Sequence, residues 1–144
     1  MLDYRVVVET GAAVLAAERA QGDDLERLDG LTERMDSATE FEDYRRADVR
    51  FHIGMAEASG AARLVAAMTE VQGQMSDLIA RIAHPSEVLR SSNEQHRRLV
   101  AALRRGDSAG TVRLVREHIE GTEHILAGLL PEPPARAGRG EGPR

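Results

Sequence analysis

The sequence of 144 residues contains no cysteine and no lysine, and each absence excludes a class of chemistry. Without cysteine there can be no disulfide, no thiolate nucleophile and no thiolate-bound metal, so any metal must be held by His, Asp or Glu. Without lysine, Walker-type phosphate loops and Schiff-base chemistry are excluded. Aromatic residues make up only 3 % of the chain, so Leu, Val, Ile, Met and Ala must build the core.

The charge balance is acidic, because 24 acidic side chains outnumber 19 arginines and the net charge is −5. This balance argues against nucleic-acid binding by this chain on its own. The first twenty residues include Asp3, Arg5, Glu9, Glu18 and Arg19, and neither a signal-peptide core nor a membrane span would tolerate them. We therefore expect a soluble cytoplasmic protein with no membrane partner.

Proline is scarce inside the chain, since four of the five prolines follow residue 130 and the fifth is Pro85. No run alternates as a strand would, and Gly60 and Gly106 are typical helix ends. Apolar periodicity predicts six helices, at residues 2–20, 23–38, 40–59, 61–83, 86–105 and 107–130. Short connections favour an all-α antiparallel bundle over residues 1–130. The Pro/Gly/Arg tail, 131–144, has no apolar periodicity, and we expect it to be disordered.

Polar residues interrupt the apolar stripes of three predicted helices. Asp48 and His52 lie four residues apart and project from one helix face beside Phe51. His96 and His118 stand at the centre of the stripes on the fifth and sixth helices. Burying these four side chains is costly unless they share a partner, and imidazole and carboxylate suit divalent transition metals. The pattern predicts a metal site, with zinc as first choice and nickel, manganese, iron or cobalt as alternatives.

Each of these residues also has a simpler interpretation. Asp48 with His52 alone is more commonly an ion pair along a helix, and a single inward histidine is more commonly a hydrogen-bonded core residue. Three inward histidines on separate helices favour the metal. The other two histidines are controls, because His84 falls at a predicted helix end and His124 lies about 240° around its helix from His118.

Several segments, in this order along the chain, resemble the FCD domain (FadR C-terminal domain) of GntR-type bacterial transcription regulators. They are Tyr4-Arg5-Val-Val-Val-Glu9, AAVLAAERA, Asp48-Val-Arg-Phe51-His52, AEASG, Glu94-Gln-His96 with the residues up to Leu103, Arg105-Gly106-Asp107 and Arg116-Glu-His118. The resemblance covers about residues 2–127. Its most specific elements are the D-x-x-F-H helix and the 22-residue step from His96 to His118.

The resemblance implies an antiparallel helical bundle that binds a small carboxylic acid above a buried metal held by the same four residues. It also implies a homodimer, and a winged helix-turn-helix DNA-binding domain N-terminal to the bundle. We expect that domain to be absent from this chain, so that any DNA contact depends on it.

An anionic effector would favour a guanidinium partner. Arg5 resembles the family's R-x-x-x-E element, Arg81 near the end of the fourth helix could reach the cavity, and Asn93 lies one turn from His96. We expect these three residues to contact the effector, although each could equally form a surface salt bridge or end a helix.

Three functions therefore stay open: a metabolite sensor that controls DNA binding, a metal-dependent hydrolase or transferase, and a dimerisation module with a purely structural metal. The enzyme is disfavoured because zinc-type chemistry needs a nearby general base, and Glu94 and Glu117 flank ligands at positions that point elsewhere on their helices. We expect the sensor and no enzymatic activity.

Overall fold

The computed structural model describes residues 2–79 and 85–129, which form six helices. They are α1 (Leu2–Arg19), α2 (Gly22–Ser37), α3 (Phe41–Ala58), α4 (Ala62–Ile79), α5 (Ser86–Arg104) and α6 (Ser108–Leu129). The predicted all-α bundle is confirmed, and the predicted helix ends agree to within one residue wherever the structure describes them. The predicted end of the fourth helix, with Arg81 and His84, and the tail 131–144 lie outside the described residues.

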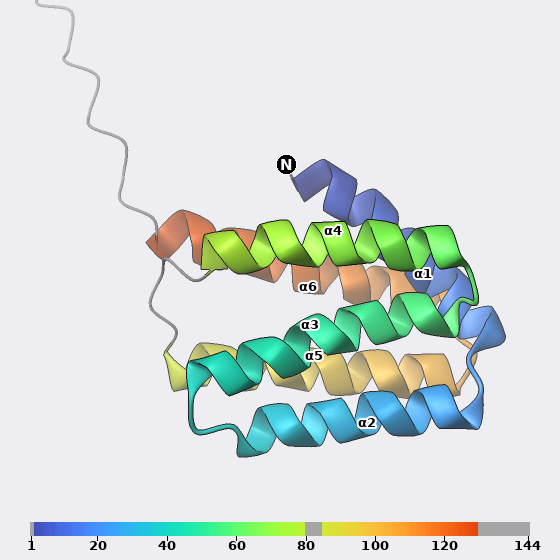
Figure 1. Cartoon of the computed structure of the whole chain (residues 1–144), viewed down its shortest axis with the longest axis horizontal. Helices are drawn as coiled ribbons and strands as arrows, with labels where there is room; N and C mark the ends of the chain where they lie inside the picture. The colour runs from blue at the N-terminus through green and yellow to red at the C-terminus, as the bar shows by residue number, and fades with distance from the viewer. Residues whose placement is uncertain (1, 80–84, 130–144) are drawn as a thin grey trace, which may run out of the picture.

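The direction of the helices alternates along most of the chain. The colours of Figure 1 show α2, α3 and α4 running back and forth across the molecule, and α5 and α6 doing the same. Each of these successive pairs packs together: α2 with α3, α3 with α4, and α5 with α6. Gly60 and Gly106 have φ values of 70° and 66° at the ends of α3 and α5, a conformation that glycine adopts without steric cost.

Helix α1 departs from this order, because it packs against α3, α4, α5 and α6 rather than mainly against its successor α2. Ala12, Ala13, Ala16 and Ala17 are all buried. Small side chains on more than one side of a helix let several neighbours approach its axis. The alanine-rich segment therefore places α1 inside the bundle.

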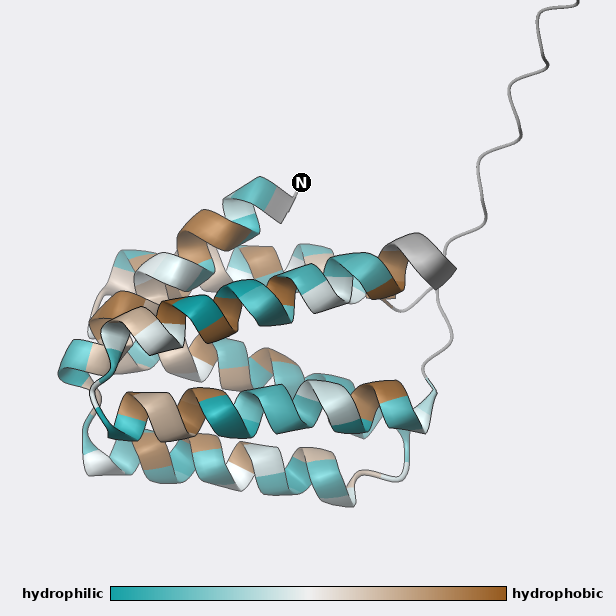
Figure 2. Cartoon of the chain, turned by 180° about the vertical axis from the view of Figure 1, so that it is seen from behind, coloured by the Kyte–Doolittle hydropathy of each residue, from teal (hydrophilic) through white to brown (hydrophobic). Residues whose placement is uncertain are grey.

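The helices are amphipathic, and brown hydrophobic segments alternate with teal hydrophilic ones along the ribbons (Figure 2). The largest fully buried side chains are Phe51, Leu28, Met55, Met68 and Leu99. His52, His96 and Asn93 are as deeply buried as these, so the core contains a polar centre. No helix in the described part of the chain is long and apolar enough to cross a membrane.

Candidate metal centre

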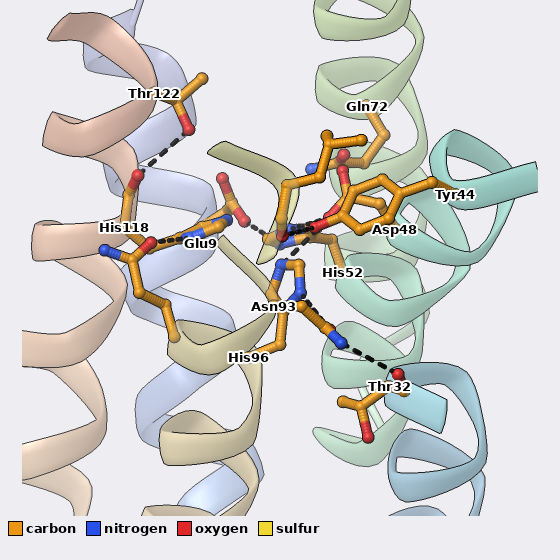
Figure 3. A network of polar contacts seen from close by, with 12 residues as sticks. Glu9, Thr32, Tyr44, Asp48, His52, Gln72, Asn93, His96, His118 and Thr122 are labelled. Atoms are coloured by element: carbon orange, nitrogen blue, oxygen red, sulfur yellow. Dashed lines mark hydrogen bonds and ion pairs between the residues drawn. The ribbon is translucent and has the colours of Figure 1, made fainter. Parts of the chain in front are cut away.

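Four side chains from three helices converge inside the bundle. Asp48 and His52 come from α3, His96 from α5 and His118 from α6, and Figure 3 shows them pointing toward one another. Each offers one ligand atom, and these four atoms all lie within 4.8 Å of one another. His52, His96 and His118 are at most 4 % exposed, whereas Asp48 is 23 % exposed. The structure thus brings together the complete set of residues predicted as metal ligands.

The Nδ1 atom of each histidine lies against a side-chain oxygen. Glu9 Oε1 is 2.5 Å from Nδ1 of His52, Asn93 Oδ1 is 3.2 Å from Nδ1 of His96, and Gln95 Oε1 is 2.7 Å from Nδ1 of His118. Such partners hold Nδ1 protonated and leave Nε2 as the electron-pair donor, which is the usual arrangement around metal-binding histidines.

The inner atoms of the cluster lack hydrogen-bond partners among the described residues. These buried atoms are Asp48 Oδ1, His52 Nε2 and His96 Nε2. Nδ1 of His52 likewise has no hydrogen bond in the described part of the chain, and its contact with Glu9 is an ion pair. Nε2 of His96 lies 3.0 Å, and Nε2 of His52 3.3 Å, from Asp48 Oδ1. With bonds of about 2.0–2.2 Å, two donors lie roughly 3.5 Å apart around a tetrahedral cation and at most roughly 4.4 Å apart around an octahedral one. The spread of the four atoms is close to the octahedral limit. The donor set and its unpartnered atoms fit a divalent transition metal.

Two carboxylates make the site strongly electronegative. Burial raises the pKa of Glu9 and of Asp48, but neighbouring charges and hydrogen bonds together outweigh burial and hold each pKa below its usual range. These neighbours are His52 and Arg5 for Glu9, and His52 and His96 for Asp48. Burial lowers the pKa of His52, yet the charges of Glu9 and Asp48 raise it to about 9. Burial lowers the pKa of His96 and, more strongly, that of His118. The two buried carboxylates therefore stay ionised because positive charge lies beside them, a role that a bound cation could share with Arg5.

A cavity of about 70 Å³ adjoins this centre. Asp48 and His118 form part of its wall, together with residues of α1, α4 and α5. By the measure of roughly 10–15 Å³ for one water molecule, it has room for about five waters or one small organic molecule. Its lining combines apolar and polar side chains: Phe41, Val49, Met75, Ile79, Val88, Leu89, Ile125 and Leu126 with Arg5, Tyr44, Arg45, Gln72, Ser76, Ser92 and Thr122.

The three residues predicted to contact the effector have different positions. Arg5 is 5 % exposed and lines the cavity; its Nε donates to Glu9, while its buried Nη1 has no hydrogen-bond partner among the described residues. Asn93 does not line this cavity, and its amide nitrogen donates to Thr32 O at 3.0 Å and to Asp36 Oδ1 at 2.6 Å. Arg81 lies outside the described residues. Of the two predicted residues that the structure describes, Arg5 thus lies at the cavity and Asn93 does not.

The sequence reasoning did not assign roles to Glu9 and Gln95. Glu9 had a usable signal, because it lies four residues after Arg5 in the R-x-x-x-E element and both side chains are buried. Gln95 had no such signal. It precedes His96 in the sequence, is only half-buried, and contacts His118 because α5 docks on α6. Of the two control histidines, His124 is exposed, as its predicted exclusion requires, and His84 lies outside the described residues.

Comparisons with known proteins point to one family. The model of the FCD domain matches residues 1–121. The HTH-type transcriptional regulator LutR of Bacillus subtilis (strain 168) is 28 % identical over 138 residues, which cover 92 % of this chain and 63 % of LutR. The solved structure of E. coli McbR/YncC has a similar fold, with a TM-score of 0.80 and 23 % identity over 88 % of this chain and 66 % of that one. The chain therefore spans slightly less than two thirds of the length of these relatives.

Proposed function

This chain belongs to the FCD domain family, and on that premise we propose that it is the metal-containing, effector-binding domain of a GntR-type transcription regulator. The observation that carries the proposal is the cluster of Asp48, His52, His96 and His118 beside a cavity that a buried arginine also lines. The similarity to LutR, whose name describes a transcriptional regulator, favours a regulatory role over an enzymatic one.

The four clustered residues would hold the cation, and zinc is our first choice because imidazole and carboxylate are its ligands where no thiolate exists. A divalent cation supplies positive charge and an attachment point for a carboxylate when it is bound. Glu9, Asn93 and Gln95 keep the three imidazoles turned so that Nε2 faces the centre. Asn93 therefore acts behind His96 in this proposal, rather than on the effector.

The effector that we propose is a small carboxylate. Asp48 and Glu9 bring two negative charges and Arg5 one positive charge, so a divalent cation with neutral histidines leaves one positive charge at the cavity. A singly charged anion balances it. The Arg5 guanidinium donates Nε to Glu9, while Nη1 lacks a partner in the described part of the chain and suits a carboxylate oxygen.

The cavity is lined by five helices, so an effector there contacts elements from both ends of the sequence. Occupancy would regulate only if the effector binds one arrangement of the helices more tightly than another. We propose that this arrangement controls a DNA-binding domain of the winged helix-turn-helix type, and that two copies of the bundle form a homodimer in the cytoplasm.

The competing functions differ in what surrounds the metal. Glu94 is exposed and pairs with Arg97, and Glu117 is also exposed, so neither supplies the general base that a hydrolase needs. A purely structural metal would stabilise the fold without any effect of carboxylates. The cavity beside the cluster, which Arg5 and apolar side chains line, favours the sensor over both alternatives.

The test is thermal unfolding of chelator-treated and zinc-loaded protein, each with and without acetate and other short mono- and dicarboxylates. We expect at least one carboxylate to raise the melting temperature only in the zinc-loaded protein. Arg5→Met should remove the rise in melting temperature that the carboxylate causes. Arg116 is exposed on α6, and the Arg116→Met variant should keep that rise. Protein that retains no zinc, or carboxylates that stabilise both forms equally, would overturn the proposal.

A further inference from the structure

We propose that Glu9 is a positioning residue that fastens α1 to the metal centre through His52 and connects that centre to Arg5. This inference rests on the proposed function, because it assigns Glu9 a role toward the same cation. It adds a helix that contributes none of the four clustered side chains.

The contacts of Glu9 divide its carboxylate between two partners. Oε1 lies 2.5 Å from Nδ1 of His52, and Oε2 accepts a hydrogen bond from Nε of Arg5. The side chain is 3 % exposed. Because Nδ1 is on the opposite side of the imidazole from the metal-facing Nε2, Glu9 acts on the orientation of the ring and not as a ligand. Figure 3 shows Glu9 reaching His52 from its own helix, away from the side on which Asp48 lies.

Glu9 differs from the partners of the other two histidines. Asn93 and Gln95 are neutral amides, and both lie on α5, which already carries His96. A carboxylate is a stronger acceptor than an amide and also increases the basicity of the ring that donates to it. Glu9 is therefore the charged member of the three, and it brings in α1.

The same turn of α1 faces the effector cavity. Arg5 lines the cavity, and its guanidinium is hydrogen-bonded to Glu9 one helical turn later. A series of contacts thus leads from the cavity to Arg5, from Arg5 to Glu9, and from Glu9 to His52 of the metal centre. A cation at the centre should restrain the first half of α1, because Glu9 connects that helix to His52. A carboxylate paired with Arg5 should restrain the same turn of α1.

The experiment is a titration of chelator-treated protein with Co²⁺, followed by its visible absorption, on the wild type, Glu9→Gln, Arg5→Met and the double variant Arg5→Met/Glu9→Gln. The double variant is included because Glu9→Gln alone leaves Arg5 buried without its counter-charge and can prevent folding. Glu18→Gln, exposed on the same helix, is the matched control. Hydrogen exchange of the α1 amides with and without Co²⁺ gives a second measurement.

We expect Co²⁺ affinity to fall by about 10–100-fold in each folded variant that lacks the Glu9 carboxylate, as for other groups that orient metal ligands. The absorption band should also shift, and Co²⁺ should no longer slow exchange in α1. Arg5→Met should bind Co²⁺ at least as tightly as the wild type, because it removes a positive charge near the cation and keeps the carboxylate.

The outcomes separate this inference from the proposed function. A wild type that binds no Co²⁺ would overturn both. A wild type that binds Co²⁺, beside a folded double variant with the same affinity, spectrum and α1 protection, would overturn the role of Glu9 alone. A purely structural Glu9 would lower the melting temperature without moving the affinity or the spectrum.

Discussion

If the four clustered residues hold a cation as proposed, replacement of His118 by Asn should remove most of the stabilisation that the cation gives to this domain. His118 is 4 % exposed, lies with the other three donors within 4.8 Å, and is held by Gln95 at 2.7 Å. His124 lies on the same helix and is exposed, so His124→Asn is a matched control. Both variants exchange an imidazole for the same small amide, and only one of them removes a proposed ligand.

The magnitude follows from linkage. A cation at about 100 times its dissociation constant stabilises the folded state by about 2.7 kcal/mol. For a folded body of this size, that free energy corresponds to a rise of roughly 10 °C in melting temperature. If the variant binds the cation about 100-fold more weakly, the stabilisation at the same concentration falls to about 0.4 kcal/mol, or roughly 1–2 °C.

Differential scanning fluorimetry at a fixed excess of Zn²⁺, with chelator-treated samples as reference, measures this difference directly. The quantity compared is the zinc-dependent shift within each variant, so any change in the stability of the metal-free protein cancels. A His118→Asn protein that keeps the full shift, or a His124→Asn protein that loses it, would refute the assignment of His118 to the site.

Two further predictions concern the fold that holds the site. Gly73 is exposed within α4 and nothing lies within 4 Å of an added Cβ, so Gly73→Ala should stabilise the protein by about 0.5–1 kcal/mol in urea unfolding. Gly54→Ala should not give this gain, because the added Cβ would lie 3.0 Å from Leu28 Cδ2. Equal gains at both positions would contradict the packing described. Phe51 is fully buried with its ring centroid 4.6 Å from that of His96, and Phe51→Ala should cost about 3–5 kcal/mol in the same assay and weaken Co²⁺ binding; a loss below 1 kcal/mol would show that Phe51 does not support the site.

The helices and the inward direction of the four clustered residues could be predicted from sequence because both depend on local periodicity. A residue four positions from His52 on a helix shares its face whatever the tertiary structure is, and Gly60 and Gly106 end helices for a local steric reason. The choice of Asp48, His52, His96 and His118 therefore follows from helical periodicity without any knowledge of how the helices dock.

The partners of these residues could not be predicted in the same way. Periodicity shows that a side chain faces inward, but the neighbour that it meets depends on how the helices dock. The pairing of Gln95 with His118 needs the packing of α5 on α6, and the contact of Glu9 with His52 needs α1 to lie inside the bundle. Asn93 shows the same limit, because its amide meets Thr32 and Asp36 of α2 and not the cavity.

The spacing of the clustered side chains along the chain has a consequence for folding. Asp48 and His118 are 70 residues apart in sequence and lie on α3 and α6, which both pack against α1. A cation held between them, as proposed, would act as a reversible cross-link. A covalent bridge closing a loop of that length would reduce the entropy of the unfolded chain by an amount worth roughly 4 kcal/mol. A chain in which α3 or α6 is undocked lacks the complete set of four donors, so the proposed metal binding and the docking of these two helices should stabilise each other.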